Sequence, residues 1–448
     1  MDDASQRRQH GAVAALPGQA RRRRLFPGNP IGRRAAADHR LWRQPDRPGL
    51  HVLVRLRPHP VALADPGFFE HDLAGRRGDG GQRGMSAFPL GFSGSYDPAD
   101  VTFLLTPVVV DFVDVAAKEA LIQSGRKHYS EMLAREKPPS PEYMAVFHQA
   151  FAANRDRVGR DVARLAKALA ARGEDGEIVL VSLARAGTPI GVLLRRALVA
   201  LGRMAVHYSV SIIRDRGIDP LAMAAILARH DPASIVFVDG WTGKGAIGGE
   251  LARAMAGDFP QLTGAPLCVL SDLAGVATLA AGDEDYVIPS AILNGIISGL
   301  ISRTVLSDDL IAPGNFHGCM LLDDLADLDL SRWYVDEQMN DVRDHLPRAR
   351  AADWSATDRA RAAAISTAFV EAMMQRTGIT DRNRVKPGIG EATRALLRRM
   401  PERLFLRDPQ DGDVGHLVAL ASSKGIAVET LADLPYSACA IIKTLGDA

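Results

Sequence analysis

The residues best suited to chemistry follow the apolar run Ile235 to Val238, which ends in the single acid Asp239. A glycine-rich turn comes next and leads into a predicted helix that starts at Ala246. Loop and first-turn amides of a helix have no intrahelical acceptor, so they can bind an anion such as phosphate. Glycines allow the backbone to close around that anion, and a threonine hydroxyl adds a donor. The predicted ligand-binding positions of this turn are Gly240, Thr242, Gly243, Lys244, Gly245 and Ala246.

A second strand, loop and helix lie upstream, where the apolar run Ile178 to Leu183 ends in Ala184-Arg185-Ala186-Gly187-Thr188. The arginine presents five donors in a fixed fork that suits phosphate oxygens. Ligands of open α/β sheets bind at the carboxyl ends of the strands. We therefore expect Arg185, Ala186, Gly187 and Thr188 to bind an anionic ligand together with Asp239.

A third charged segment, Arg214-Asp215-Arg216 before Gly217, lies between these two loops. It is typical of a mobile loop that closes over a charged ligand, with Arg214 and Arg216 neutralising negative charge. Ordinary exposed loop charges remain the alternative.

Three cysteines, Cys268, Cys319 and Cys439, are far apart and match neither a disulfide framework nor a zinc spacing. Free thiols favour a reducing cytoplasm. His317 and Cys319 are two residues apart and would share one face of a strand, which leaves open a cysteine protease. Two residues on one strand rarely form the required hydrogen-bonded pair. Cys268 lies within an apolar strand, where a thiol is usually buried and inert.

The elements that position these residues predict an α/β domain. Continuous apolar strands such as residues 178–183 and 235–238 are typical of a buried parallel sheet. Helices are expected over about residues 112–135, 142–171 and 221–230, and another beginning at Asp272. We expect this domain to occupy residues 85–345.

Residues 1–84 contain 16 arginines, no lysine and 8 acidic residues, a net charge of +8 that leaves −7 for the remainder. The segment lacks helical or strand periodicity, and we predict a disordered extension or a start codon assigned too early, with Met85 as the natural start. An arginine-rich segment can also bind nucleic acid. No apolar run reaches membrane-spanning length, so no membrane partner is expected.

Residues 346–448 are predicted to form a helical connector and a small α/β domain. Helices are expected over residues 358–376, 391–400 and 416–424, and strands over residues 403–407 and 426–430. A last helix is expected to begin at Leu434. This alternation indicates a small α/β sandwich.

Five motifs together resemble one group, the phosphoribosyltransferase-like proteins of tellurium-resistance gene clusters, some also labelled cysteine protease StiP. The motifs are GFSGSYDPADVTFLL, SLARAGTPIG, HYSVSIIRDRGID, VFVDGWTGKGAI and IPSAILNGIISGLISRTV. The tail VGHLVALASSKGIAVETLADLPYSACAIIKTLG looks like the Pelota-type RNA-binding domain joined to that group. The resemblance implies a type I phosphoribosyltransferase-like parallel sheet and a role in a stress response. The sequence departs from the phosphoribosyltransferase loop pattern in two respects. Val238-Asp239 stands where two adjacent acids are usual, and the gap from the acid to Thr242-Gly243 is one residue shorter than in the common pattern.

The resemblance implies transfer from 5-phosphoribosyl-1-diphosphate with Mg²⁺, to an acceptor that the sequence does not reveal. Asp239 would bind the ribose hydroxyls, whereas Arg185, Arg214 and Mg²⁺ would bind the diphosphate. The tail would bind RNA phosphates through Lys386, Arg398, Arg399 and Lys424. The alternatives are a non-catalytic, nucleotide-sensing RNA-binding protein and the cysteine protease. A homodimer is one oligomeric state that remains open.

Overall fold

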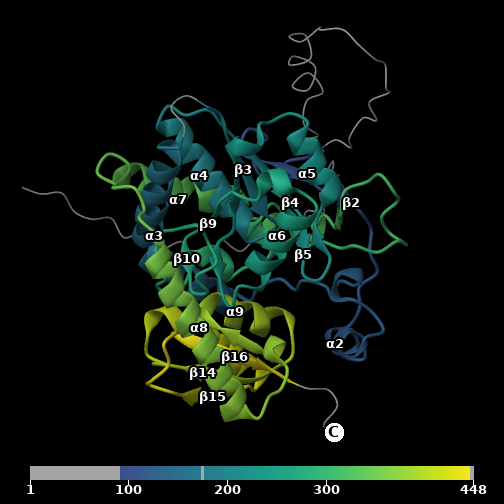
Figure 1. The fold of residues 1–448 in the computed structure, drawn as a ribbon. Coiled ribbons are helices and arrows are strands. Elements are labelled where there is room, and N and C mark those ends of the chain that lie inside the picture. Colours follow the sequence, from purple (N-terminus) through teal and green to yellow (C-terminus); the bar gives the residue numbers. More distant parts are fainter. Residues whose placement is uncertain (1–90, 173–175, 444–448) are drawn as a thin grey trace, which may run out of the picture. The chain divides into compact units, whose positions relative to one another are not determined.

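The computed structural model describes residues 91–172 and 176–443. The predictions for residues 1–84 therefore lie outside the described residues. The described chain contains a six-stranded sheet and, in its C-terminal part, a four-stranded sheet (Figure 1).

Every neighbouring pair in the six-stranded sheet is parallel. Strands β3 and β7 lie at its centre and are buried along their whole length. The strands in sheet order are β1 (Thr102–Leu104), β4 (Ala205–Val210), β3 (Ile178–Leu183), β7 (Ile235–Val238), β9 (Leu267–Val269) and β11 (Leu279–Ala280).

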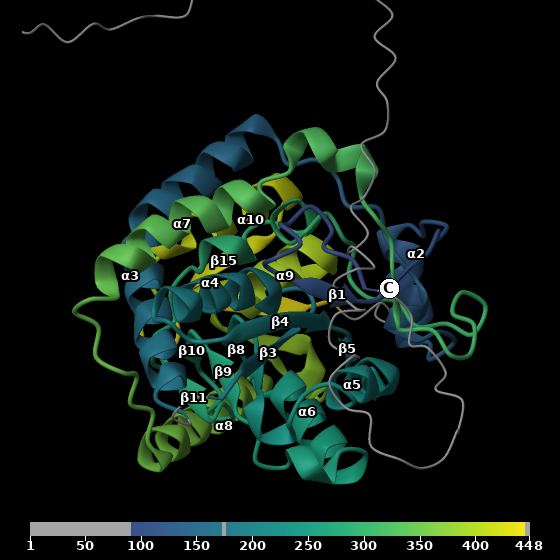
Figure 2. The same ribbon diagram turned by 90° about the horizontal axis from the view of Figure 1, so that it is seen from above.

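Helices cover both faces of this sheet, as successive side chains of β3 show. Ile178 and Leu180 join one apolar cluster, and Val179, Val181 and Leu183 join another. The first cluster includes helices α3 (Pro141–Ala170), α4 (Gly187–Ala200) and α7 (Ser331–His345). The second includes α5 (Pro220–Leu227) and α6 (Ala246–Gly257), on the opposite side of the sheet in Figure 2. The predicted parallel α/β sheet with flanking helices is confirmed.

Short strands extend or flank the central sheet. At the carboxyl ends of β7 and β9, β8 (Trp241–Thr242) pairs in parallel with β10 (Ser271–Asp272). The other short pairs are β2 (Thr106–Pro107) with β12 (Gly318–Cys319) and β5 (Ile212–Ile213) with β6 (Gly217–Ile218).

Two predicted helices differ from the structure. The helix expected over residues 112–135 is only α2 (Val115–Gln123), because Gly125 adopts a left-handed conformation and a short 3-10 turn follows at Tyr129–Glu131. No helix starts at Asp272. Its carboxylate instead accepts the Val276 and Ala277 N–H groups, which closes a tight turn.

The C-terminal sheet has the order β13 (Val385–Pro387), β16 (Ala438–Ile442), β14 (Pro401–Leu406) and β15 (Ala427–Thr430). Helices α9 (Gly388–Arg398) and α10 (Gly415–Lys424) join the apolar cluster on one face, and α8 (Ala356–Thr377) joins the cluster on the other. The helix predicted from Leu434 is wrong. Its apolar residues form β16 instead, buried between β13 and β14.

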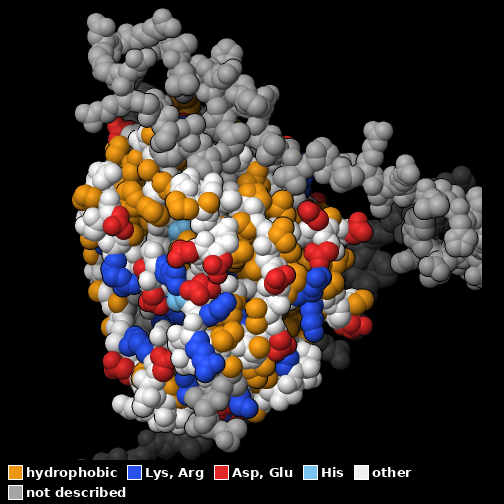
Figure 3. All heavy atoms as spheres, turned by 90° about the vertical axis from the view of Figure 1, so that its right-hand side faces the viewer, with side chains coloured by type: hydrophobic (Ala, Val, Ile, Leu, Met, Phe, Trp, Pro, Cys, Tyr) orange, Lys and Arg blue, Asp and Glu red, His pale blue; other side chains and the backbone are white. Residues whose placement is uncertain are grey.

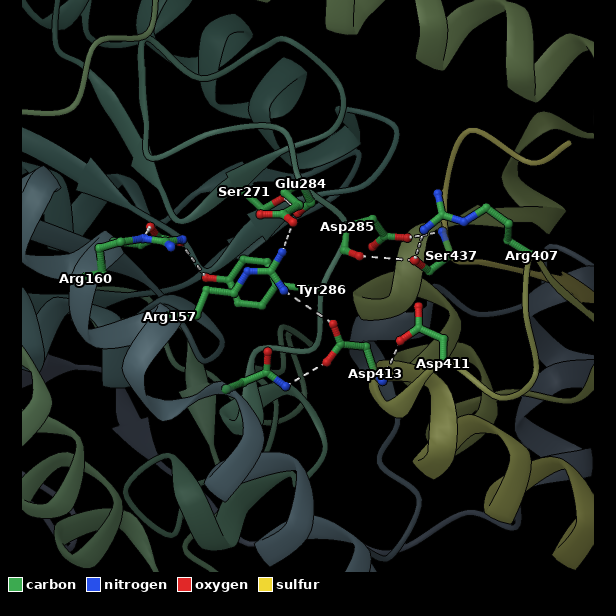
Figure 4. Close-up of polar contacts among 12 residues, drawn as sticks. Arg157, Arg160, Ser271, Glu284, Asp285, Tyr286, Arg407, Asp411, Asp413 and Ser437 are labelled. Atoms are coloured by element: carbon green, nitrogen blue, oxygen red, sulfur yellow. Dashed lines mark hydrogen bonds and ion pairs between the residues drawn. The ribbon is translucent and has the colours of Figure 1, made fainter. Parts of the chain in front are cut away.

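A polar network joins the C-terminal sheet to helix α3 and the segment before Tyr286 (Figure 4). Arg157 forms ion pairs with Glu284 and Asp413, and its guanidinium lies 4.1 Å from the centroid of the Tyr286 ring. Asp285 accepts the N–H groups of Ile389 at 2.9 Å and Ser437 at 2.8 Å. These contacts hold α9 in place beside the carboxyl end of β7.

Candidate functional site

The two predicted anion loops meet at the carboxyl ends of neighbouring parallel strands. β3 pairs with β7 in register from Val179 and Ile235 onward, so their loops leave the sheet side by side. The approach is close, since a Cβ on Gly187 would lie 2.3 Å from the Val238 carbonyl oxygen. Only glycine fits at that position.

Helix α6 directs its N-terminus into the space beside these loops. Its N-cap residue is Gly245, with φ of 78°. Because glycine has no side chain, no capping hydrogen bond reaches the first amides of the helix. Ala246, Ile247 and Gly248 line a cavity of about 230 Å³. Unpaired amides and the helix dipole both favour an anion there.

The C-terminal domain forms the second wall of this cavity. Helix α9 packs so closely on the loop that a Cβ on Gly243 would lie 2.2 Å from Glu391 Cγ. The Arg394 guanidinium lies 4.4 Å from the centroid of the Trp241 ring. Lys386 on β13 completes this wall.

The third wall comes from α2 and from loops after the main sheet. Lys118 is 8% exposed and lines the cavity. Among the residues that the structure describes, its Nζ has no hydrogen-bond partner and no ion pair. Arg303 donates to the backbone oxygens of Tyr129 and Met132. The cavity, here called the cationic cavity, is lined by eight Lys and Arg side chains (Lys118, Arg214, Lys244, Arg303, Lys386, Arg394, Arg398 and Arg399) and by the carboxylates of Asp239 and Glu391.

Crowding of like charges and burial shift the protonation of these groups. Burial, with the neighbouring Arg303, Arg399 and Arg398, lowers the pKa of Lys118 to about 7. Burial, with Lys386 nearby, likewise lowers the pKa of Lys244 to about 7. Near pH 7 these two lysines are therefore less fully charged than exposed lysines, and a bound anion would favour their charged forms.

The pKa values of the two carboxylates, Asp239 and Glu391, shift in opposite directions. Burial raises the pKa of Asp239 to about 6, against the attraction of Arg394. Burial also acts to raise the pKa of Glu391, but Lys386, Arg394 and Lys244 together hold it below its usual value. Glu391 is thus an ionised partner of the cations, whereas Asp239 is protonated more readily than an ordinary aspartate.

The structure brings most of the predicted turn residues into the cationic cavity. Asp239, Thr242, Gly243, Lys244, Gly245 and Ala246 all line it, as does Arg214. Gly240 lies behind them, with its N–H donating to Asp239 Oδ1 at 2.8 Å. The Thr242 hydroxyl donates to Asp272 at 2.6 Å and accepts the Ala274 N–H, so its hydrogen is committed to the fold. Lys244 donates to the Arg382 and Val385 carbonyl oxygens.

The upstream loop does not line the cationic cavity. Arg185 is 6% exposed, pairs with Glu136 and donates to the Ile301 carbonyl at 2.5 Å. Thr188 shares a hydrogen bond of 2.8 Å with Ser209. Ala186 and Gly187 begin helix α4. Arg216 lies outside as well, paired with Glu131.

The predicted RNA contacts divide between two places. Lys386, Arg398 and Arg399 line the cationic cavity. Arg398 donates to Asn294 Oδ1, and Arg399 forms a two-bond pair with Glu119 at 2.7 and 2.5 Å. Lys424 lies on α10 and donates to the Leu396 carbonyl.

Several lining residues were not predicted from the sequence. Lys118 is far from the glycine turn along the chain, and no motif marked it. Arg303 lies within the motif IPSAILNGIISGLISRTV but was not among the predicted site residues. A signal existed for Arg394, which precedes Arg398 by four residues and therefore lies on the same helix face.

The three cysteines do not form a catalytic pair in the described residues. Cys268, Cys319 and Cys439 are buried, and burial raises the pKa of each thiol to about 12. No described imidazole is within hydrogen-bond reach of any of them. The His317 ring contacts Ser211 Oγ at 2.9 Å through Nδ1, and among the described residues no hydrogen bond joins it to Cys319.

Fold and cavity together define an α/β protein with a cationic cavity lined by residues of the main sheet region and of the C-terminal region. Residues 94–339 match a protein family described as tellurite-like stress resistance cysteine protease StiP, and residues 364–444 match the PELOTA RNA binding domain. A relative named "Cysteine protease StiP" from Acinetobacter baylyi is 44% identical over 367 residues, which is 80% of this chain and 95% of the relative. This chain belongs to the StiP family. No solved structure matches it.

These comparisons overturn one prediction. The family and the relative are both named for a cysteine protease, a hydrolase, so the predicted phosphoribosyltransferase, with 5-phosphoribosyl-1-diphosphate as donor, is wrong. The cysteine protease that the sequence left as an alternative agrees with these names. The predicted Pelota-type RNA-binding domain is confirmed as a match.

Two further findings concern the described residues alone. None of their helices combines the length and apolar character needed to cross a membrane. Within the same part of the chain, no group of three or more His, Cys, Asp or Glu side chains is arranged to hold a metal ion.

Proposed function

We propose that this chain binds a phosphorylated, polyanionic ligand in the cationic cavity, and that its C-terminal domain binds RNA. The observation that supports the proposal is the lining itself, in which eight cationic side chains and a helix N-terminus oppose two carboxylates. The Pelota match supports the RNA-binding part. This corresponds to the nucleotide-sensing RNA-binding alternative.

The distribution of charge favours several phosphate oxygens over a single carboxylate. Lys244 and Lys386 belong to the glycine turn and β13, whereas Lys118 and Arg303 belong to α2 and to a loop after the main sheet. A single carboxylate offers two oxygens to these four cations, but a diphosphate or a nucleotide presents oxygens in several directions. Charge-assisted hydrogen bonds to such oxygens are about twice as strong as neutral ones.

Mg²⁺ has a restricted place in this proposal. The described residues hold no group of metal ligands, and only Asp239 and Glu391 supply carboxylates to the cavity. We therefore expect Mg²⁺ to enter bound to the phosphates of the ligand. The finer prediction, a type I phosphoribosyltransferase-like sheet, remains a prediction about the fold and carries no reaction with it.

Isothermal titration calorimetry with pyrophosphate and with methanedisulfonate, with and without Mg²⁺, tests the proposal. We expect binding that Lys118→Met weakens by about tenfold or more, equivalent to about 1.4 kcal/mol. The control is Lys167→Met, because Lys167 lies on α3 and lines none of the cavities described here. No heat with either anion, or equal weakening by both variants, would contradict the proposal.

Membership of the StiP family supports a second candidate function, cysteine proteolysis. A cysteine nucleophile needs an ionised sulfur and a base. Because all three thiols are buried with raised pKa, this function requires a rearrangement that exposes one of them. Cys319 is the candidate, since Arg185 acts to lower its pKa and His317 is close in the chain.

Peptide cleavage by single Cys→Ser variants at positions 268, 319 and 439 tests this candidate. Of the three variants, we expect only Cys319→Ser to lose cleavage. We also expect iodoacetamide to label Cys319 under the conditions that allow cleavage. Cleavage that survives removal of all three cysteines would exclude a cysteine mechanism.

A further inference from the structure

The wall that the C-terminal domain gives to the cationic cavity lies entirely within its RNA-binding match. Lys386 and the α9 residues Arg394, Arg398 and Arg399 fall inside residues 364–444. These cations face the cavity and its rim. The RNA-binding domain and the cavity therefore share the same charged residues.

A second hollow of about 400 Å³ adjoins the cationic cavity. The two share Ile122, Tyr129 and Arg214 in their linings, so they are continuous there. The second hollow adds three exposed cations, Arg126, Lys127 and Arg216, with the acids Glu131 and Asp215 beside them. Figure 3 views the side of the molecule that carries α2, where Lys and Arg side chains form separate groups among acidic ones. The second hollow, here called the path, therefore carries cations on its lining where it adjoins the cavity.

The charge of the cavity favours the end of a strand. The glycine turn, α9 and α2 bring cations from three parts of the chain to one space. A terminal phosphate carries about −1.5 to −2 charges near neutral pH, whereas an internal phosphodiester carries one. Lys118, which has no described partner, lies where the additional charge would be neutralised.

An aromatic side chain lies along the same path. Tyr129 lines both hollows and is only partly buried, whereas Trp241 lines the cavity but is buried, with Arg394 over its ring. Proteins that bind single-stranded RNA commonly stack unpaired bases on aromatic rings. Paired bases of a duplex are not available for such stacking.

We propose that the ligand of the cationic cavity is the phosphorylated end of a single RNA strand, with the adjoining nucleotides in the second hollow. This inference rests on the proposed function, since it requires that the cavity binds phosphate. It names the ligand class that neither the family nor the relative provides.

Fluorescence anisotropy with the full chain tests this inference, using one short RNA sequence with a 5′-phosphate, a 3′-phosphate or hydroxyls at both ends, and a blunt duplex as a fourth probe. We expect one of the two end-phosphorylated strands to bind at least about tenfold more tightly than the hydroxyl-ended strand, and the duplex to bind weakly. Comparison of the 5′ and 3′ forms identifies which end enters.

Two variants separate the cavity from the path. Lys118→Met should remove the preference for the phosphorylated end, whereas Lys127→Met should weaken all single strands to a similar extent. Lys167→Met should change neither, and thermal denaturation establishes that each variant is folded.

The outcomes distinguish the two proposals. Equal binding of phosphorylated and hydroxyl-ended strands, while pyrophosphate still binds by calorimetry, would overturn the RNA-end inference and leave the phosphate-binding function intact. Failure of pyrophosphate and methanedisulfonate to bind would overturn both. Duplex binding as tight as that of the phosphorylated strand would also overturn the inference.

Discussion

Affinity of the cationic cavity for an anion should fall steeply as pH rises through 7. The pKa of Lys118 and of Lys244 is lowered to about 7 by burial and by neighbouring cations. Each lysine is charged below that pH and neutral above it. A bound anion favours the charged forms, so binding takes up protons and becomes weaker as they are lost.

The size of the effect follows from these values. Between about pH 6 and about pH 8 the charged fraction of a group with pKa near 7 falls from about nine-tenths to about one-tenth. If the anion requires the charged form, each lysine contributes about a tenfold loss of affinity, and the two together about a hundredfold or 2.7 kcal/mol. Asp239, with a pKa of about 6, acts in the same direction because it gains negative charge as pH rises. Glu391 remains ionised throughout, since its pKa is held low.

The assay is calorimetric titration with methanedisulfonate, because the charge of this dianion does not change over the range. Lys118→Met and Lys244→Met should each remove about one tenfold step from the pH dependence. Lys167→Met should retain the full dependence. An affinity that is constant or rises between about pH 6 and about pH 8 would refute the argument that these lysines neutralise the ligand.

Three further predictions concern stability, measured as the free energy of unfolding in urea. Burial raises the pKa of Asp239 to about 6, so the folded state keeps a proton that the unfolded chain loses, and stability declines as pH rises from about 4 through about 6. Asp239→Asn should therefore stabilise the protein by roughly 3 kcal/mol at about pH 8 and little at about pH 4; an equal change at both pH values would contradict this. Gly243→Ala, whose Cβ would lie 2.2 Å from Glu391 Cγ, should destabilise by about 1–3 kcal/mol, whereas Gly257→Ala, with no atom within 4 Å, should not. Asp285→Ala leaves the N–H groups of two distant segments without their acceptor and should cost on the order of 2 kcal/mol, with Asp283→Ala at a surface ion pair as the nearly neutral control.

Local sequence patterns determined the strands and helices that carry the candidate site. The bounds predicted for β3 and β7 agree with the structure, because apolar runs that end in turn residues specify buried parallel strands directly. The glycine turn and the start of α6 were also readable, since the requirement for unpaired amides and close backbone approach is local. The same local reasoning failed after Tyr436, where a short apolar run fits a helix as well as a strand and only pairing with β13 and β14 decides.

Tertiary structure alone decided which charges meet. Lys118 and Arg303 reach the cavity from segments that are distant from the glycine turn in sequence, and no spacing rule connects them. Arg185 was expected to bind the ligand, but the fold pairs it with Glu136 and places it beside the cavity's lining. The pKa values of the lysines and of the cysteine thiols depend on burial and on distant neighbours, which chain order does not contain. The sequence by itself thus determined that an anion-binding turn exists, and the packing of α2 and α9 against it determined the strength and shape of the site.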